Sequence, residues 1–448
     1  MLERRLEYQS LKTILQHMDA NARFKISLHM PSIENVEKSL PLKIKNFFLD
    51  SPFTRINDSY YELCVQRCYP GGNAPQTILS ERLENGPDCD FDEFGFPFVS
   101  SVLLPGDVSF QNENRKVRFD TEEDERVLRR ELSLHEKVLE LRKSITSRGM
   151  TVHDYLNSVG LSPFDEHLGE EDKVVGALIE DREFLPRHIE EYKIKLQPFE
   201  CRRNNTKPPF TCYIQLSIGK GEERQLQRFE YNKKLFEASK QLNEFLYGDR
   251  TMPIRIGEFS YTSLNVTFRL PTDFRIQVQK GCLTHYDVMH KNFPLIVDNS
   301  ESLNVLQLDG LLSPVDAFDH QIVRNATRLI INGAYEISSQ RLVQVIEDLP
   351  NREICVLARD RNHLPEFHFT MIQSWSSSER QVGSSLWISA KNERTANDVL
   401  DLILAQCEKS RKSERGVTVD LKNSIGLEAY TVPSQGRAWM LKMNIVKV

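Results

Sequence analysis

Apolar side chains recur every three or four positions along the first forty residues, which is the spacing of one helical face. The pattern breaks at residues 19–21 and then resumes. Pro31 suits the first turn of a further helix, which Pro41 ends. We therefore predict a small unit of short helices over residues 1–49. Its apolar positions are Leu11, Ile14, Leu15, Met18, Phe24, Ile26 and Leu28.

Residues 42–70 carry β-forming side chains and are predicted to be extended. The run PGGN at residues 70–73 marks a turn after them. Gly and Pro then interrupt every regular pattern. The whole stretch 50–117 is accordingly predicted to be an extended, loop-rich region.

A charged amphipathic helix is predicted over residues 121–147. Thr121 and Asp124 have the spacing of a capping box at its start. The apolar residues of this helix fit packing on its own domain, and a short coiled-coil seam is the alternative. The helix forms the main part of a predicted helical connector over residues 118–190.

The carboxyl half alternates between strand and helix patterns. Two stretches with strand patterns, 210–218 and 225–231, flank the sequence GKG, which is typical of a hairpin. Beyond residue 260, short apolar strands recur at intervals of roughly 24 to 31 residues, and the low end of this range matches the period of leucine-rich repeats. The strict LxxLxLxxN signature is absent. The six strands are 276–278, 305–308, 329–331, 354–357, 386–388 and 417–421.

These patterns together predict an α+β protein. Its last segment, 191–448, is predicted to be an α/β repeat region. There, strand–helix units would stack into a curved, largely parallel sheet that resembles leucine-rich repeats and serves as the recognition domain. An ordinary α/β domain with unequal units is the alternative.

Composition narrows the classes of function. A length of 448 residues is enough for a sizeable core, and the net charge of −6 argues against a dedicated nucleic-acid binder. The first residues lack an apolar signal segment, and no stretch is apolar enough to span a membrane. The eight cysteines form no CxxC pair, as expected of free thiols in a reducing compartment. We expect an intracellular protein, cytoplasmic or nuclear, that binds neither nucleic acid nor membrane.

Motifs that carry chemistry are missing. Three alternating aspartates at residues 88–92 lack the Gly and Glu of a calcium loop, so we interpret them as a solvated acidic loop. The spacings of a phosphate-binding loop, a zinc-binding HExxH and a GxSxG elbow do not occur. Cys64 and Cys68 stand in a predicted strand and are assigned to packing. We expect no cofactor, no metal and no catalysis; an enzyme with an unrecognised site in 191–448 is a further alternative.

The three tryptophans lie in the repeat region. Buried aromatic residues usually belong to the core, whereas tryptophan is also enriched where proteins anchor their partners. Trp375, Trp387 and Trp439 are therefore candidate partner-binding residues, with a core role as the alternative.

One family resemblance is visible. The amino-terminal stretch YQSLKTILQHMDANARFKISLHMPSIENVEKSLPLKI contains an SLKxIL opening, an AN-x-R turn and an MPSI segment, and IND, SYYEL and CVQRCYPGG follow it. With these cues it resembles the start of the F-box C proteins, a family expanded in nematodes whose members carry a domain of unknown function. The later sequences FDHQIV at 318–323, SW at 374–375 and VG at 382–383 resemble the F-box-associated carboxyl halves of nematode proteins.

The resemblance implies a role in ubiquitin transfer. The helical unit would dock on the Skp-type adaptor of a cullin-RING ubiquitin ligase through the seven apolar residues named above, and the rest of the chain would select a protein substrate. The sequence departs from the general F-box pattern, because Gln9-Ser10 replaces the usual Leu-Pro and the usual Cys and Trp of the third helix are absent. An F-box-derived scaffold without ligase contact is therefore the alternative.

Overall fold

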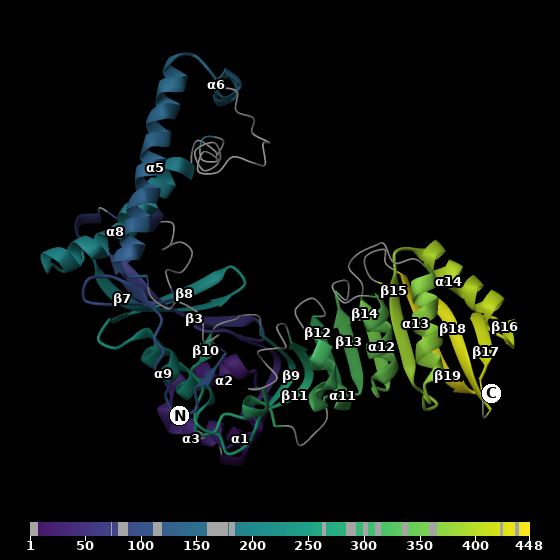
Figure 1. Ribbon diagram of the computed structural model, residues 1–448. Coiled ribbons are helices and arrows are strands. Elements are labelled where there is room, and N and C mark those ends of the chain that lie inside the picture. Colours follow the sequence, from purple (N-terminus) through teal and green to yellow (C-terminus); the bar gives the residue numbers. More distant parts are fainter. Residues whose placement is uncertain are drawn as a thin grey trace. The chain divides into compact units, whose positions relative to one another are not determined.

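The computed structural model shows an α+β protein, as the sequence predicts (Figure 1). Its backbone divides into two compact units. The first comprises Met1–Tyr60, Leu103–Asn112 and Leu242–Val448, and the second comprises Tyr61–Val102 and Glu113–Gln241. The four consecutive segments predicted from the sequence do not coincide with these units, since each unit is assembled from stretches far apart in the chain. The structure describes residues 8–72, 74–78, 88–110, 119–158, 178, 184–261, 266–283, 293–298, 303–309, 315–333, 339–357, 365–421, 424–434 and 439–448.

The first unit is built on a long sheet with a parallel centre. Its neighbours run in the order β2-β1-β9-β11-β12-β13-β14-β15-β19-β18-β17-β16, and every pair from β1 to β15 is parallel. The pairs at both ends are antiparallel. These strands are β1 (Lys43–Leu49), β2 (Phe53–Ile56), β9 (Ile254–Tyr261), β11 (Ile276–Leu283), β12 (Val305–Asp309), β13 (Arg328–Asn332), β14 (Glu353–Leu357), β15 (Ser385–Ala390), β16 (Ser410–Lys412), β17 (Gly416–Asp420), β18 (Ile425–Pro433) and β19 (Trp439–Lys447). A separate short pair joins β6 (Val108–Ser109) to β10 (Thr267–Phe268).

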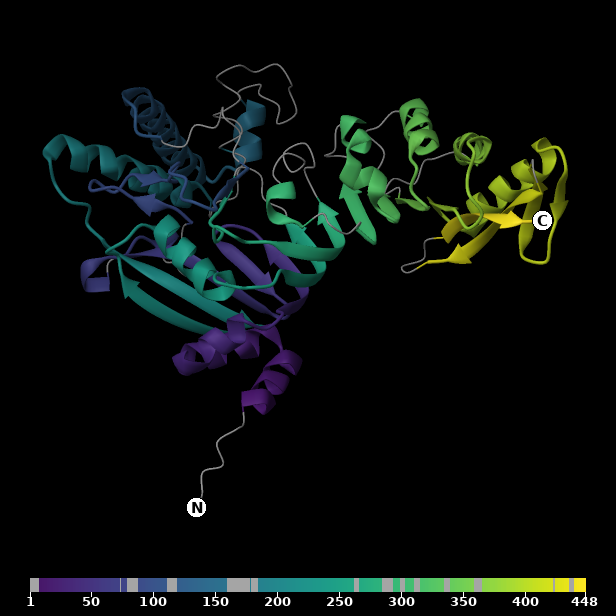
Figure 2. The same ribbon diagram turned by 90° about the horizontal axis from the view of Figure 1, so that it is seen from below.

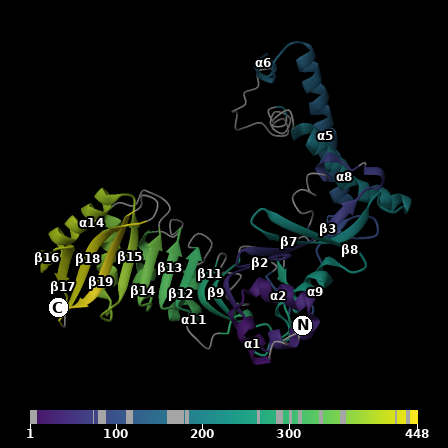
Figure 3. The same cartoon turned by 180° about the vertical axis from the view of Figure 1, so that it is seen from behind.

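Helices follow most of the later parallel strands and cover one face of the sheet (Figures 1 and 2). Parallel strands that advance in one direction with right-handed crossovers place all their connecting helices on the same side. Leu306, Ile331, Ile354 and Ile388 point to that side and are almost fully buried. The opposite side of strands β11 to β19, seen in Figure 3, is called the helix-free face below. The covering elements are η2 (Val315–Asp319), α11 (Gln321–Asn325), α12 (Ser339–Asp348), α13 (Pro365–Ser377) and α14 (Glu393–Gln406).

The predicted succession of strands is largely confirmed. Five of the six apolar strands, from β11 to β15, are neighbours in one parallel sheet. The prediction is wrong for the sixth stretch, 417–421, which falls in β17 of an antiparallel meander. After α14 the chain turns back on itself, and β19 takes the place beside β15 that a further parallel strand would have occupied.

Three short helices begin the described part of the first unit, in agreement with the spacing of the apolar residues: α1 (Tyr8–His17), α2 (Ala20–His29) and α3 (Pro31–Lys38). The carboxylate of Asp19 caps α2 by accepting the backbone N–H of Asn21 at 2.9 Å. Pro31 opens α3, as predicted.

The AN-x-R and IND motifs hold these helices against the β1–β2 hairpin. The side chain of Asn21 donates to the carbonyl oxygen of Ile56 at 2.9 Å, and the amide of Asn57 donates to the Asp19 carboxylate at 2.6 Å. Asn57 has a φ of 56°, a left-handed conformation that asparagine adopts more readily than most residues. Its side-chain oxygen accepts two backbone N–H groups of β1. Residues of both motifs therefore have a structural role at the junction of helix and sheet.

A buried ion network completes this junction. Glu37 of α3 binds Arg23 of α2 at 2.8 Å and Arg250 at 3.0 Å, and all three side chains are at most 4% exposed. Arg23 also donates to the carbonyl oxygens of Pro41 and Glu37. Burial lowers the pKa of both arginines, and the Glu37 carboxylate opposes that shift. The helices are thus an integral edge of the first unit.

The second unit combines a three-stranded sheet with a helical hairpin. The predicted capping box is present in both directions between Thr121 and Asp124, and Val138 and Ile145 pack on helices of the same unit. This packing agrees with the own-domain interpretation of the long helix. The elements are β3 (Ser59–Cys68), η1 (Pro70–Gly72), β4 (Asp90–Phe91), β5 (Pro97–Phe98), α5 (Glu122–Ser147), α6 (Val152–Ser158), α8 (Phe184–Asn204), β7 (Thr211–Lys220) and β8 (Glu223–Glu230).

The interpretation of residues 88–92 as a solvated loop is wrong for Asp90, which is 2% exposed. Its carboxylate accepts the Tyr231 hydroxyl at 2.6 Å and the backbone N–H of Leu235 at 2.7 Å. Leu235 begins α9 (Leu235–Tyr247), so Asp90 satisfies a donor at the start of that helix. The sequence gives no local sign of this contact, because the partners lie more than 140 residues away.

Candidate interaction surface

The seven apolar residues of the amino-terminal helices divide by burial. Leu15 and Phe24 are 1% and 3% exposed and belong to the core. Ile14 and Leu28 are 46% and 53% exposed. Leu11, Met18 and Ile26 are half-buried. A partner of these helices would therefore meet Ile14 and Leu28, while Leu15 and Phe24 hold the fold.

The three tryptophans also occupy different environments. Trp375 on α13 is fully buried beneath the Arg380 guanidinium, which lies 5.6 Å from its ring. Arg380 in turn donates to carbonyl oxygens at the end of α12. Trp439 is half-buried in β19, opposite Ala390. Trp387 is flanked in β15 by the buried residues Leu386 and Ile388, whose side chains point to the helices. Because successive side chains of a strand point to opposite faces, Trp387 is the only one of the three that lies on the helix-free face.

Strand register gathers cations and aromatic rings around Trp387. In the pairing of β15 with β19, Lys442 stands directly opposite Trp387, and in the next pairing Tyr430 stands opposite Lys442. The Lys442 Nζ lies 4.2 Å from the Trp387 ring and 5.9 Å from the Tyr430 ring. From the other side, the Arg328 guanidinium lies 5.7 Å from Trp387. Arg328, Glu353, Trp387, Tyr430 and Lys442 are called the Trp387 patch below.

The patch carries an excess of positive charge. The Arg328 Nε lies 3.7 Å from the Glu353 carboxylate, and both side chains are more than one third exposed. Within the described part of the chain, Lys442 has aromatic neighbours and no carboxylate partner. A half-exposed cation over an aromatic ring is stabilised by about 0.5–1 kcal/mol. The two cations are therefore held in place while one of them stays available to a negatively charged group.

Cys355 lies between Arg328 and Trp387 on the same face and is 5% exposed. Burial raises the pKa of its thiol above the ordinary value, and Arg328 opposes this shift. The thiol is consequently protonated at neutral pH, which is unsuited to nucleophilic catalysis. All eight cysteines are free.

Two other places in the structure gather polar side chains. In the second unit, burial and the bond to Asp90 raise the pKa of Tyr231, and burial raises the pKa of Cys212 to about 11. Lys234 donates to the Phe91 carbonyl oxygen at 3.0 Å. These groups satisfy one another around the start of α9, so the cluster has a structural explanation.

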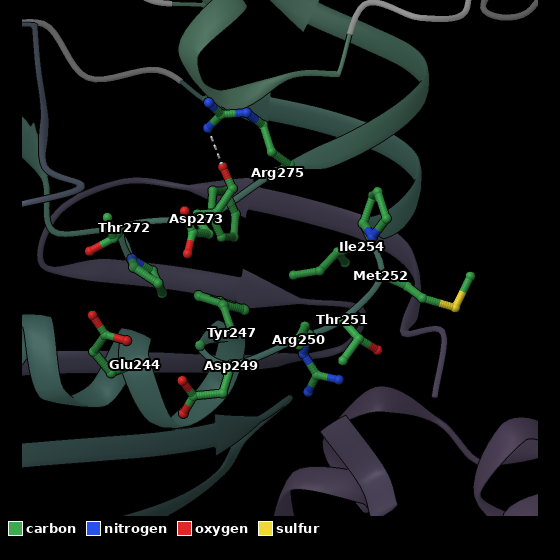
Figure 4. A pocket seen from close by; sticks show the side chains of 14 residues that line it. Glu244, Tyr247, Asp249, Arg250, Thr251, Met252, Ile254, Thr272, Asp273 and Arg275 are labelled. Atoms are coloured by element: carbon green, nitrogen blue, oxygen red, sulfur yellow. Dashed lines mark hydrogen bonds between the residues drawn. The ribbon is translucent and has the colours of Figure 1, made fainter. Parts of the chain in front are cut away.

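In the first unit, a pocket of about 370 Å³ lies beyond the end of α9 (Figure 4). Both arginines that line this pocket already bond to other groups of the chain. Arg275 donates to the carbonyl oxygens of Phe274 and Leu295, and Arg250 binds Glu37. His and Cys are absent from its lining residues. Among the residues that the structure describes, no three His, Cys, Asp or Glu side chains converge on a metal-sized site.

Sequence reasoning identified Trp387 but missed its companions. Lys442 and Tyr430 reach it only through the antiparallel return of β19 and β18, which no local pattern indicates. The available signal for Arg328 and Glu353 was their place as the polar first residues of the otherwise mainly apolar strands β13 and β14.

Comparison with known proteins gives one match. The sequence model of a family described as a domain of unknown function (DUF3557) matches residues 234–392. This stretch includes Arg328, Glu353 and Trp387 but ends before Tyr430 and Lys442. No curated protein and no solved structure matches the chain. In the described residues, no helix is both long enough and apolar enough to cross a membrane.

Proposed function

We propose that the chain is a non-catalytic protein-interaction protein that recognises its partner through the Trp387 patch. The observation that carries this proposal is the row formed by Arg328, Trp387, Lys442 and Tyr430 on a sheet face without helices. Tryptophan, tyrosine and arginine are the residues that most often dominate binding energy at protein interfaces. Proteins built from stacked leucine-rich-repeat-like units commonly bind partners along such a free surface.

The charge of the patch specifies its partner further. Glu353 offsets Arg328, and Lys442 leaves one net positive charge beside two aromatic rings. An acidic segment of a protein substrate is therefore the complementary ligand, since opposite charges favour the encounter and select the register. Binding should weaken as the salt concentration rises.

The amino-terminal helices supply the second part of the proposal. By their resemblance to F-box C proteins, they would dock on a Skp-type adaptor, so that the chain brings its substrate to a cullin-RING ubiquitin ligase. Of the seven apolar residues predicted for this contact, Ile14 and Leu28 are exposed.

A scaffold without ligase contact is the second candidate, and one observation favours it. The Arg23–Glu37–Arg250 network and the burial of Leu15 and Phe24 commit much of the helical unit to the fold. The large apolar side chains left exposed for an adaptor are Tyr8, Ile14, Leu28 and Met30.

Direct binding separates the two candidates. Purified full-length chain is titrated with a purified Skp-type adaptor by calorimetry up to tens of micromolar. Saturable binding that is lost in the Ile14→Asp, Leu28→Asp double variant supports ligase recruitment. If no heat is measured at that concentration, the free energy of binding is weaker than about −6 kcal/mol, and the result supports the scaffold function.

The patch is tested independently by co-purification. Proteins retained by the wild-type chain are compared with those retained by Lys442→Glu and by Lys280→Glu, a control on the helix-free face whose lysine pairs with Glu258. We expect a defined set of partners to be lost from Lys442→Glu alone. Equal retention by all three chains would refute the role of the patch.

A further inference from the structure

The hairpin of the second unit ends in a strand that is exposed along almost its whole length. β8 pairs with β7, and among the described residues it is the last strand of its sheet (Figure 3). Leu226 and Phe229 on this strand are 47% and 49% exposed. An edge strand of this length presents unpaired backbone N–H and C=O groups and is a ready template for another strand.

The turn of the hairpin fixes which backbone groups are free. Lys220 and Glu223 pair across a two-residue turn that contains Gly221 at a φ of 59°. In such a hairpin the pair that flanks the turn is hydrogen-bonded, and the bonded pairs then alternate along the ladder. Residues 225, 227 and 229 therefore bond to β7. Residues 224, 226, 228 and 230 direct their backbone groups outward.

This alternation limits how two copies of β8 can pair. In an antiparallel pair around a two-fold axis, outward-facing residues must stand opposite outward-facing residues, and two registers then join nearly the whole strand. A register centred on Leu226 places Arg224 opposite Arg228 of the partner subunit. A register centred on Gln227 places Arg224 opposite Glu230 of the partner subunit, twice by symmetry.

We propose that β8 is a self-association edge, which joins two copies of this chain antiparallel in the register centred on Gln227. Opposite charges directly across a strand pair are stabilising and like charges are destabilising, so the sequence of β8 selects this register over its neighbour. In the same register, the exposed Phe229 packs along the aliphatic part of Gln225 of the partner subunit, and Leu226 packs along that of Arg228 of the partner subunit. The proposal is independent of the Trp387 patch, which lies in the other unit.

Sedimentation velocity of the full-length chain over a range of concentrations tests the proposal. We expect a reversible monomer–dimer equilibrium. Arg224→Glu places two glutamate pairs face to face and should weaken dimerisation at least about tenfold. The double variant Arg224→Glu, Glu230→Arg restores opposite charges and should recover the wild-type affinity. Glu222→Lys, a charge change at the tip outside the ladder, should leave it unchanged.

A backbone variant gives a second test. The N–H of Leu226 faces outward, so Leu226→Pro removes a donor from the dimer and none from the β7–β8 ladder; proline is tolerated at such edge positions. We expect monomers with an unchanged circular dichroism spectrum. The proposal is overturned if the wild-type chain is monomeric at several hundred micromolar, if a dimer persists in Leu226→Pro, or if the charge swap fails to restore it.

Discussion

The amino-terminal helices and the helix-free face both contain ion pairs and apolar side chains, but they use them in opposite ways. In the helices, Glu37 and its two arginines are almost fully buried and fasten one element to another. On the helix-free face, Arg328 and Glu353 are more than one third exposed and Lys442 lies near the rings of Trp387 and Tyr430. The first set therefore maintains the fold, whereas the second is the one that we propose for binding.

Replacing the central carboxylate is the strongest way to test this contrast. Glu37→Ala leaves Arg23 and Arg250 buried without a counter-charge, which should destabilise the first unit by about 3–5 kcal/mol. Glu353→Ala on the helix-free face should cost less than about 1 kcal/mol, since its pair with Arg328 is solvent-exposed. Calorimetric unfolding of both variants, with the exposed Lys25→Ala on α2 as control, measures the difference. Similar losses for Glu37→Ala and Glu353→Ala would contradict the assignment.

Two adjacent residues of α1 provide the next comparison. Leu15 is buried and Ile14 is nearly half exposed. Leu15→Ala should lower the free energy of unfolding by about 2–5 kcal/mol, because it opens a cavity. Ile14→Ala should change it by no more than about 0.5 kcal/mol. Urea unfolding followed by circular dichroism checks both, and a large loss from Ile14→Ala would mean that this residue belongs to the core.

On the helix-free face, replacing Lys442 should change the affinity for the partner much more than the stability of the fold. Lys442→Glu removes the available cation and should weaken retention of the partner at least tenfold, about 1.4 kcal/mol. The melting temperature should change little, since the lost contacts with Trp387 and Tyr430 contribute about 0.5–1 kcal/mol. Titration of a recovered partner against both chains, at low and at high salt, gives the two affinities. Unchanged binding combined with a large loss of stability would reverse the interpretation of this residue.

The smallest effect concerns Cys355 beneath the patch. Its raised pKa means that the thiolate, the form that reacts with iodoacetamide, appears only as the pH rises past the ordinary value of a thiol. The alkylation rate of this residue should therefore still be increasing above about pH 9. Arg328→Ala should move the curve to higher pH, because the guanidinium favours the thiolate. Mass spectrometry of the Cys355 peptide follows the rate, and a shift to lower pH would exclude this role of Arg328.

The features that could be predicted from the sequence are those that neighbouring residues determine. The spacing of Leu11, Ile14 and Leu15 predicted α1, and Thr121 with Asp124 predicted the start of α5. Strands β11 to β15 were found because each is a short apolar run with a helix or loop after it. Their parallel order was confirmed by the register.

The features that were missed depend on residues far apart in the chain. From the sequence, Asp90 is expected to be a surface carboxylate, and only the structure places Tyr231 and Leu235 beside it. The position of β17 could not be read from its apolar residues, because a strand in a parallel repeat and a strand in a meander have the same local pattern. The Trp387 patch could be predicted only in part for the same reason. The sequence identifies Trp387 as a candidate, but Lys442 looks like an ordinary surface lysine unless β19 is known to pair with β15.

The parallel pairing of β1 with β9 has a consequence for synthesis of the chain. β1 ends at residue 49, and its neighbour β9 begins only at residue 254. A ribosome that adds about 5–20 residues per second needs roughly 10–40 seconds to cover that distance. During this time, helices α1 to α3 lack both the neighbouring strand and Arg250. The nascent first unit therefore has to wait for the second to be translated, and this interval is when a chaperone would find its apolar surfaces exposed.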